Sequence, residues 1–121
     1  MTDTKLQGIF EAYLDAFAAT SQAEQERLLR SSVAEDVVYT NPGAEGRGLQ
    51  NLLKHISVFQ ERFPGYRFRV NWFRHQHGQL LAEWTQVSED GRELLTAHSY
   101  GRLNELNLIA HLAGFWSPGA V

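Results

Sequence analysis

The spacing of apolar residues changes once along the chain, from a helical period in the first half to a strand period in the second. Apolar side chains recur at intervals of three and four residues over 3–19 and over 49–63, which predicts two amphipathic helices. Between them, Ser21 followed by Glu24 is typical of a helix start, and a shorter helix is expected to run to about Ser31. The first half therefore contributes three predicted helices.

A short strand is expected before the third helix. The segment Asp36-Val37-Val38-Tyr39-Thr40-Asn41-Pro42 combines β-branched residues with a terminal turn signal. Alternate residues of a strand share a face, so Tyr39 and Asn41 are predicted to lie on the same side. Two interpretations of Asn41 stay open: a polar group at the floor of a pocket, or a turn residue that hydrogen-bonds its own backbone.

Beyond the third helix the pattern alternates with a period of two. Four strands are predicted, at 66–73, 80–87, 93–103 and 108–116, and turn sequences separate them. Hairpin connections make such a meander antiparallel. The expected fold class is therefore α+β: a cone-shaped, curved, mostly antiparallel sheet with three helices from the N-terminal half, which enclose a pocket.

Composition is that of an ordinary globular domain. The chain has 121 residues, 43% hydrophobic and 21% charged, which fits a single domain over residues 1–121. A net charge of −3 and dispersed arginines argue against nucleic-acid binding. No apolar run reaches membrane-spanning length, and Asp3, Lys5 and Glu11 stand where a signal peptide would be apolar. A cytoplasmic protein without membrane contact is expected.

The order of elements resembles the nuclear transport factor 2-like superfamily, and within it the SnoaL-like, polyketide-cyclase-like branch. The resemblance rests on the 36–42 segment, on Gly46-Arg47-Gly48 and on Phe63-Pro64-Gly65-Tyr66-Arg67-Phe68, and it covers nearly the whole chain. It implies a cystatin-like α+β roll. It does not select one function, because the superfamily holds ketosteroid isomerases, dehydratases, epoxide hydrolases, polyketide cyclases and non-catalytic modules.

The resemblance to ketosteroid isomerases implies three catalytic residues. Tyr13 stands where those enzymes carry a tyrosine on the first helix, Asn41 where they carry the general-base aspartate, and His98 where they carry a protonated aspartate. The candidate proton acceptor is His98 or His111, and Tyr13 or Tyr39 is the candidate donor to a carbonyl oxygen. If the strand register is shifted by one residue, Glu83 enters the pocket as the base instead.

Other enzymes of the superfamily match only in part. Tyr39 and Asn41 resemble the pair that holds the attacking water in epoxide hydrolases, but the arginine and two aspartates that those enzymes need are missing from the matching positions. His111 resembles a polyketide cyclase residue, but the aspartate expected soon after it is absent.

Strand parity predicts an aromatic, weakly polar cavity for an apolar, cyclic small molecule. The expected ligand-binding residues are Tyr39, Trp72, Trp84, Tyr100, His111, Phe17 and Phe115, with Phe68, Val70 and Gln86 completing the wall. His55, at the margin of its helix's apolar stripe, is expected to be a half-exposed surface histidine. An isomerase, cyclase or dehydratase is expected, with a non-catalytic binding or dimerisation module as the alternative.

No metal or cofactor is expected, because the chain lacks cysteine and the pair His75 and His77 has no third ligand nearby. A homodimer is expected through the other face of the sheet. That face is predicted to be too apolar for open water, with Leu95, Ala97, Leu108, Ala110, Leu112 and Trp116.

Overall fold

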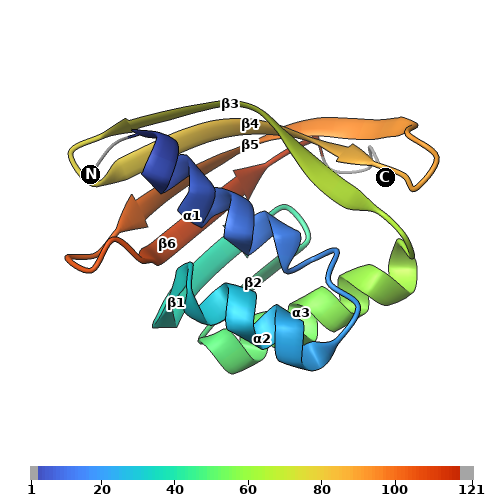
Figure 1. Ribbon diagram of the computed structural model, residues 1–121, viewed down its shortest axis with the longest axis horizontal. Helices are drawn as coiled ribbons and strands as arrows, with labels where there is room; N and C mark the ends of the chain where they lie inside the picture. Colours follow the sequence, from blue (N-terminus) through green and yellow to red (C-terminus); the bar gives the residue numbers. More distant parts are fainter. Residues whose placement is uncertain (1–2, 118–121) are drawn as a thin grey trace.

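The structure is a computed structural model that describes residues 3–117 (Figure 1). The elements in chain order are α1 (Asp3–Asp15), α2 (Gln22–Arg30), β1 (Val33–Asn41), β2 (Ala44–Arg47), α3 (Leu49–Arg62), β3 (Arg67–Gln76), β4 (Gln79–Val87), β5 (Glu93–Leu103) and β6 (Ile109–Phe115). The predicted helices and the four-strand meander are confirmed. The ends of the predicted domain, residues 1–2 and 118–121, lie outside the described residues.

All the strands belong to one sheet, in the order β2-β1-β6-β5-β4-β3. The strands β3 to β6 pair antiparallel in succession, and β1 runs parallel to β6. The sheet curves around the helices, which all lie on its concave side (Figure 1). The predicted α+β cone is therefore confirmed, and the opposite face of the sheet, called the outer face below, carries no helix.

The core fills the space between the helices and the concave face. Its largest fully buried apolar side chains come from every layer: Phe10, Leu29, Leu49, Leu52, Ile56, Leu80, Ile109, Val33 and Val37. This core occupies one end of the cone. The other end, beyond the last turn of α1, is left to the cavity described below.

The segment predicted as a plain turn before the third helix contains the strand β2. It pairs antiparallel with β1, and Tyr39 lies opposite Gly46. A Cβ at Gly46 would stand 2.6 Å from the Tyr39 hydroxyl oxygen, so this close approach requires glycine. The Tyr39 hydroxyl donates a hydrogen bond to Oδ1 of Asn51 at 2.5 Å, which ties β1 to the first turns of α3.

The link between α1 and α2 is held by two glutamine side chains. Gln60 of α3 donates to the backbone carbonyls of Phe17 and Ala19 at 2.9 and 2.7 Å. Gln25 of α2 donates to the same Ala19 carbonyl at 3.0 Å and to Gln60 Oε1 at 3.1 Å. These bonds satisfy carbonyls just past the end of α1 and fix the place of the Phe17 ring.

Candidate functional site

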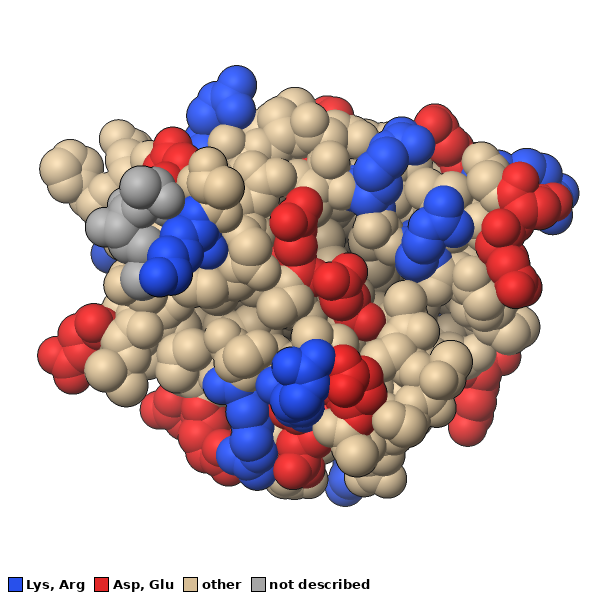
Figure 2. Space-filling view, viewed as in Figure 1, with Lys and Arg blue, Asp and Glu red and all other residues tan. Residues whose placement is uncertain are grey.

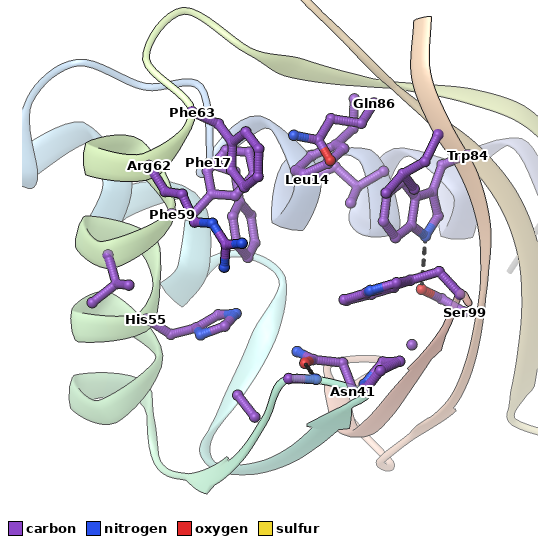
Figure 3. A pocket seen from close by; sticks show the side chains of 18 of the residues that line it. Leu14, Phe17, Asn41, His55, Phe59, Arg62, Phe63, Trp84, Gln86 and Ser99 are labelled. Atoms are coloured by element: carbon purple, nitrogen blue, oxygen red, sulfur yellow. Dashed lines mark hydrogen bonds between the residues drawn. The ribbon is translucent and has the colours of Figure 1, made fainter. Parts of the chain in front are cut away.

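A cavity of about 440 Å³ lies between α3, the end of α1 and the concave face of the sheet (Figure 3). Its size is that of a small-molecule site. The lining residues are Tyr13, Leu14, Phe17, Asn41, Pro42, Gly43, Ala44, His55, Val58, Phe59, Arg62, Phe63, Phe68, Trp84, Gln86, Leu95, Ser99, Gly114 and Trp116. Of the predicted site residues, the structure brings Tyr13, Phe17, Asn41 and Trp84 to this cavity.

One wall of the cavity comes from a single face of α3. His55, Phe59 and Arg62 follow each other at intervals of four and three residues, so their side chains project from the same side of the helix. Figure 3 shows the His55 and Arg62 side chains extending from α3 toward the cavity. The neighbouring face of the same helix carries the buried residues Leu52 and Ile56. Packing of α3 on the core therefore presents an imidazole and a guanidinium to the cavity.

The opposite wall, from the sheet, is aromatic. The ring centroids of Phe68 and Trp84 are 4.7 Å apart and those of Trp84 and Trp116 are 5.9 Å apart, both edge-to-face. The Trp84 indole N–H donates to Oγ of Ser99 at 2.9 Å, so its polar end is satisfied within the wall. At Gly114 a Cβ would stand 3.1 Å from the Trp116 ring, which needs this space.

Tyr13 enters the cavity from α1. Its ring lies edge-to-face with that of Phe17, with centroids 5.4 Å apart. Among residues 3–117 its hydroxyl has no hydrogen-bond partner. Burial raises the pKa of Tyr13, and the nearby Tyr39 hydroxyl adds to this effect, so the phenol stays protonated at neutral pH. Tyr13 is therefore a neutral O–H donor that is free to bind a ligand oxygen.

Asn41 lines the cavity and is also a turn residue, so both interpretations left open by the sequence hold. Its Oδ1 accepts a hydrogen bond from the backbone N–H of Gly43 at 2.9 Å (Figure 3). The amide NH₂ is the end left for a ligand, and an amide cannot act as a base near neutral pH.

His55 is the imidazole of this cavity. It is half-buried, which agrees with the predicted half-exposed position, but its place in the cavity lining was not predicted. Its ring centroid is 5.3 Å from that of Tyr39 and 6.1 Å from that of Phe17. Burial lowers the pKa of His55, so its neutral form predominates at pH 7. The signal that sequence reasoning missed is its spacing: His55 is one helical turn before Phe59, on the flank of the apolar stripe that faces the sheet.

The prediction that His98 faces the cavity is wrong. His98 lies on the outer face, in a row across neighbouring strands with Trp72, Glu83 and Phe115. Its Nε2 is 3.1 Å from Oε1 of Glu83, and 47% of its side chain is exposed. Trp72 and Phe115 also lie on the outer face, so the prediction that they bind the ligand is wrong. The alternative in which Glu83 enters the pocket is wrong too.

Three further predicted ligand-binding residues lie away from the cavity. The Tyr100 hydroxyl donates to Oε1 of Gln79 at 2.7 Å on the outer face. His111 is paired across the sheet with Arg102, next to the inward-facing Leu112, and also points outward. Tyr39 faces inward as predicted, but it is buried in the core beneath Gly46 and only borders the cavity wall.

Several residues of β5 and β6 that were predicted for the outer face point inward instead. Leu95 and Trp116 line the cavity, and Ala97 and Leu112 belong to the buried core. The cause is the hairpin register, which places Ala97 opposite the inward-facing Trp84 and so turns Leu95, Ala97 and Ser99 inward. In β3 a separate bulge between Val70 and Trp72 reverses the alternation of faces and turns Trp72 outward.

Comparison with known proteins places this architecture in a family. A sequence model of the SnoaL-like domain matches residues 10–111. The chain belongs to the SnoaL-like family. No functionally curated protein matches the SnoaL-like domain described here.

Solved structures resemble this SnoaL-like domain over most of its length. A candidate isomerase of the SnoaL-like family from Agrobacterium tumefaciens superposes with a TM-score of 0.86 at 25% identity, over 94% of this chain and 98% of that one. A candidate polyketide cyclase from Sinorhizobium meliloti gives 0.72 at 16% identity, over 94% and 99%. A protein of cystatin-like fold from Nostoc punctiforme gives 0.76 at 10% identity, over 96% and 91%. The last two likenesses concern the fold alone.

Other features of residues 3–117 bear on metal, membrane and nucleic-acid binding. Within residues 3–117 no group of three His, Cys, Asp or Glu side chains is placed to hold a metal ion. No helix in the described part of the chain combines the length and apolarity needed to cross a membrane. On the face drawn in Figure 2, Lys and Arg alternate with Asp and Glu rather than gathering in one patch. The cytoplasmic location and the lack of nucleic-acid binding stay predictions.

Proposed function

We propose that this protein binds an apolar, cyclic small molecule in the cavity between α3 and the sheet. The observation that carries the proposal is a set of polar groups that face an aromatic cavity without a partner in the described chain: the Tyr13 hydroxyl, the His55 imidazole and the Gln86 amide nitrogen. Buried polar groups in folded proteins are nearly always hydrogen-bonded. Groups left unpaired at a cavity wall are therefore suited to bind ligand atoms.

The shape of the walls favours a ring. Trp84 and Trp116 lie edge-to-face, and Phe68 adds a third ring beside Trp84. Faces and edges of aromatic side chains pack well against flat or cyclic molecules, and each such pair contributes about 0.5–1.5 kcal/mol beyond area burial. A ligand seated here has apolar contact on the sheet side and polar contact from α1 and α3.

A proton-transfer reaction is the catalytic form of this proposal, and His55 favours it. A neutral imidazole can take a proton from the carbon next to a ligand carbonyl, while the electron pair moves onto the carbonyl oxygen. The Tyr13 hydroxyl is suited to hydrogen-bond that oxygen, and the Asn41 NH₂ to orient it. As the electron pair returns from the oxygen, delivery of the proton from His55 to another carbon of a conjugated system completes an isomerisation. Delivery of the same proton to a hydroxyl on the neighbouring carbon, which then leaves as water, completes a dehydration.

Two observations support this chemistry and one supports plain binding. His55 takes the role of proton acceptor that the sequence had suggested for His98, and the SnoaL-like relative from Agrobacterium tumefaciens is itself a candidate isomerase. On the other side, no carboxylate of residues 3–117 lines the cavity, so the usual base of the ketosteroid isomerases is missing from this part of the chain. A non-catalytic ligand-binding module is therefore the alternative.

Tryptophan fluorescence tests the binding proposal directly. Titration of cyclic ketones and polyketide-like rings into the protein is expected to change the emission of Trp84 and Trp116, which line the cavity. Trp84→Phe should lose much of this response, whereas Trp72→Phe, on the outer face, should retain it. An equal response in the two variants would place binding outside the cavity and reject the proposal.

Turnover assays separate the catalytic form from plain binding. For each ring compound that binds, exchange of a proton next to its carbonyl for deuterium is followed by NMR. His55→Gln is expected to abolish exchange while retaining binding, since only the proton acceptor is lost. If the wild-type protein binds a ring compound but does not exchange its proton, the catalytic form is rejected and the non-catalytic binding module is the remaining function.

We also propose that the protein forms a homodimer through the outer face of its sheet. The residues that support this differ from those predicted, because the outer face carries Trp72, Leu81, Tyr100 and Phe115 instead. Leu81 and Phe115 are 44% and 60% exposed in the single chain. Large apolar side chains that share one uncovered face are typical of an interface.

A further inference from the structure

The lining of the cavity is positive and carries no negative group. Arg62 on α3 is the fixed cation among the lining residues, and no Asp or Glu lines the cavity within residues 3–117. Arg62 is an exposed residue, so it lies at the rim of the cavity and solvent partly screens its charge, but its guanidinium can still pair with an anionic group of a ligand there. The cavity therefore favours a ligand with an anionic group.

Arg62 is not committed to a carboxylate of the protein. Its guanidinium carbon lies 5.4 Å from the centroid of the Phe63 ring, and no hydrogen bond or ion pair joins it to another described residue. Arg27 and Arg69, on the outside of the molecule, are paired with glutamates. Figure 3 shows the Arg62 side chain passing Phe59 and turning its guanidinium into the cavity. Arg62 is thus held by ring stacking with its donors left for a ligand.

Gln86 marks a second polar point, on the sheet side. It is only 4% exposed, and its Nε2 has no hydrogen-bond partner in the described part of the chain. A buried amide N–H without a partner is costly, and a ligand oxygen would satisfy it. Arg62 comes from α3 and Gln86 from β4, with the aromatic rings of the sheet wall, Trp84 among them, beside Gln86 (Figure 3).

We propose that the ligand is a cyclic, largely apolar carboxylic acid whose carboxylate is bound by Arg62. The ring lies against the aromatic wall that includes Trp84, and a second oxygen of the ligand faces Gln86. A guanidinium suits this role because its planar fork donates two parallel hydrogen bonds to one carboxylate. The inference rests on the proposed function, since it names the chemical class of the molecule that the same cavity would bind.

Matched acids and esters test the inference. A panel of carboxylic acids with one to three rings, naphthalene-2-carboxylate among them, is titrated by calorimetry alongside the methyl ester of each acid. The wild-type protein is expected to prefer the acids. Arg62→Gln should lower acid affinity about 5-fold, since the exposed guanidinium is screened by solvent, and leave ester affinity unchanged. Arg47→Gln, an exposed arginine on β2 outside the cavity, removes the same charge and should leave both unchanged.

The outcomes separate the inference from the function on which it rests. Acids and esters that bind equally well, or equal losses in Arg62→Gln and Arg47→Gln, would overturn the carboxylate inference while binding itself upholds the proposed function. If the neutral esters bind and none of the acids does, the carboxylate inference is likewise overturned and the proposed function upheld. If no ring compound of either kind binds the wild-type protein, both the inference and the proposed function fail.

Discussion

The imidazole Nε2 of His98 lies 3.1 Å from Oε1 of Glu83, directly across the β4–β5 pair on the outer face of the sheet. This pair ties two strands together on the side away from the cavity. It explains why neither residue can act on a molecule bound inside the cone. Both side chains are partly exposed, so the contact is a surface hydrogen bond with a small contribution to stability.

His98→Ala is therefore expected to change the free energy of unfolding by less than about 1 kcal/mol, as exposed pairs do. It should leave ligand affinity as in the wild-type protein, because its side chain does not line the cavity. His55→Ala is the matched comparison from inside the cavity, and it should weaken binding. Fluorescence titration measures both affinities, and a loss confined to His98→Ala would contradict the site as described.

The sequence predicts the elements of this fold well because each depends on local signals. The expected start of the second helix is confirmed by the bond from the Glu24 backbone N–H to Oγ of Ser21 at 3.1 Å. The inward face of β1 is also confirmed, since Val37 and Tyr39 are both buried. The superfamily resemblance is confirmed by the SnoaL-like match over residues 10–111.

The facing of β5 could not be obtained from its sequence alone. Its inward residues Ala97, Ser99 and Gly101 are small, because Trp84 and Leu112 fill the space over them. A large aromatic or a histidine is the usual mark of a pocket wall, and in this strand those residues, His98 among them, point outward. The small inward residues can be recognised only once the register between β4 and β5 is known, since Ala97 faces inward because it lies opposite Trp84.

Gly46→Ala tests the contact between β2 and the core. The added Cβ would stand 2.6 Å from the hydroxyl oxygen and 2.7 Å from Cζ of Tyr39, whose ring is buried and cannot move aside. Overpacking of this kind costs about 1–3 kcal/mol of unfolding free energy. Gly8→Ala is the control, because it lies in α1 with nothing within 4 Å of the new Cβ and should be neutral or stabilising. Urea denaturation measures both, and an unchanged midpoint for Gly46→Ala would refute the tight packing.

Gln60→Leu tests the link that positions Phe17. The variant removes the hydrogen bonds to the carbonyls of Phe17 and Ala19 and leaves the part-buried Phe17 carbonyl unpaired, while the Ala19 carbonyl keeps its bond from Gln25. We expect a loss of about 1–3 kcal/mol in stability, together with weaker ligand binding because the Phe17 ring is released. Gln50→Leu, an exposed position on the same helix, should retain both properties. Stability loss with undiminished ligand affinity would show that this link does not position the cavity wall.

The homodimer is tested by sedimentation at micromolar concentration. A stable interface of this type buries on the order of 1,600 Å² in total. Phe115→Glu places a charge on the most exposed aromatic side chain of the outer face and should give a folded monomer. Val58→Glu is the control, since Val58 is 61% exposed on α3 and away from that face. A wild-type protein that sediments as a monomer would refute the dimer.

The pH dependence of stability is expected to report on His55. Burial lowers its pKa below the ordinary value of 6.5, so between the two pKa values the unfolded chain binds more protons than the folded chain. Stability should therefore be full above pH 6.5 and should fall as the pH decreases from 6.5 toward the lowered pKa.

The groups that face the imidazole are the Tyr39 ring from β1, the Phe17 ring after α1 and, along α3, Arg62; none of these titrates in that range, and no described lining residue is a carboxylate. Urea denaturation near neutral pH and near about pH 5 should show a smaller difference for His55→Gln than for the wild-type protein. His98→Gln, which removes a histidine from the outer face, is the control for titration at the surface. If His55→Gln keeps the full pH dependence, the imidazole is not held neutral by the cavity, and its role as proton acceptor loses its physical basis.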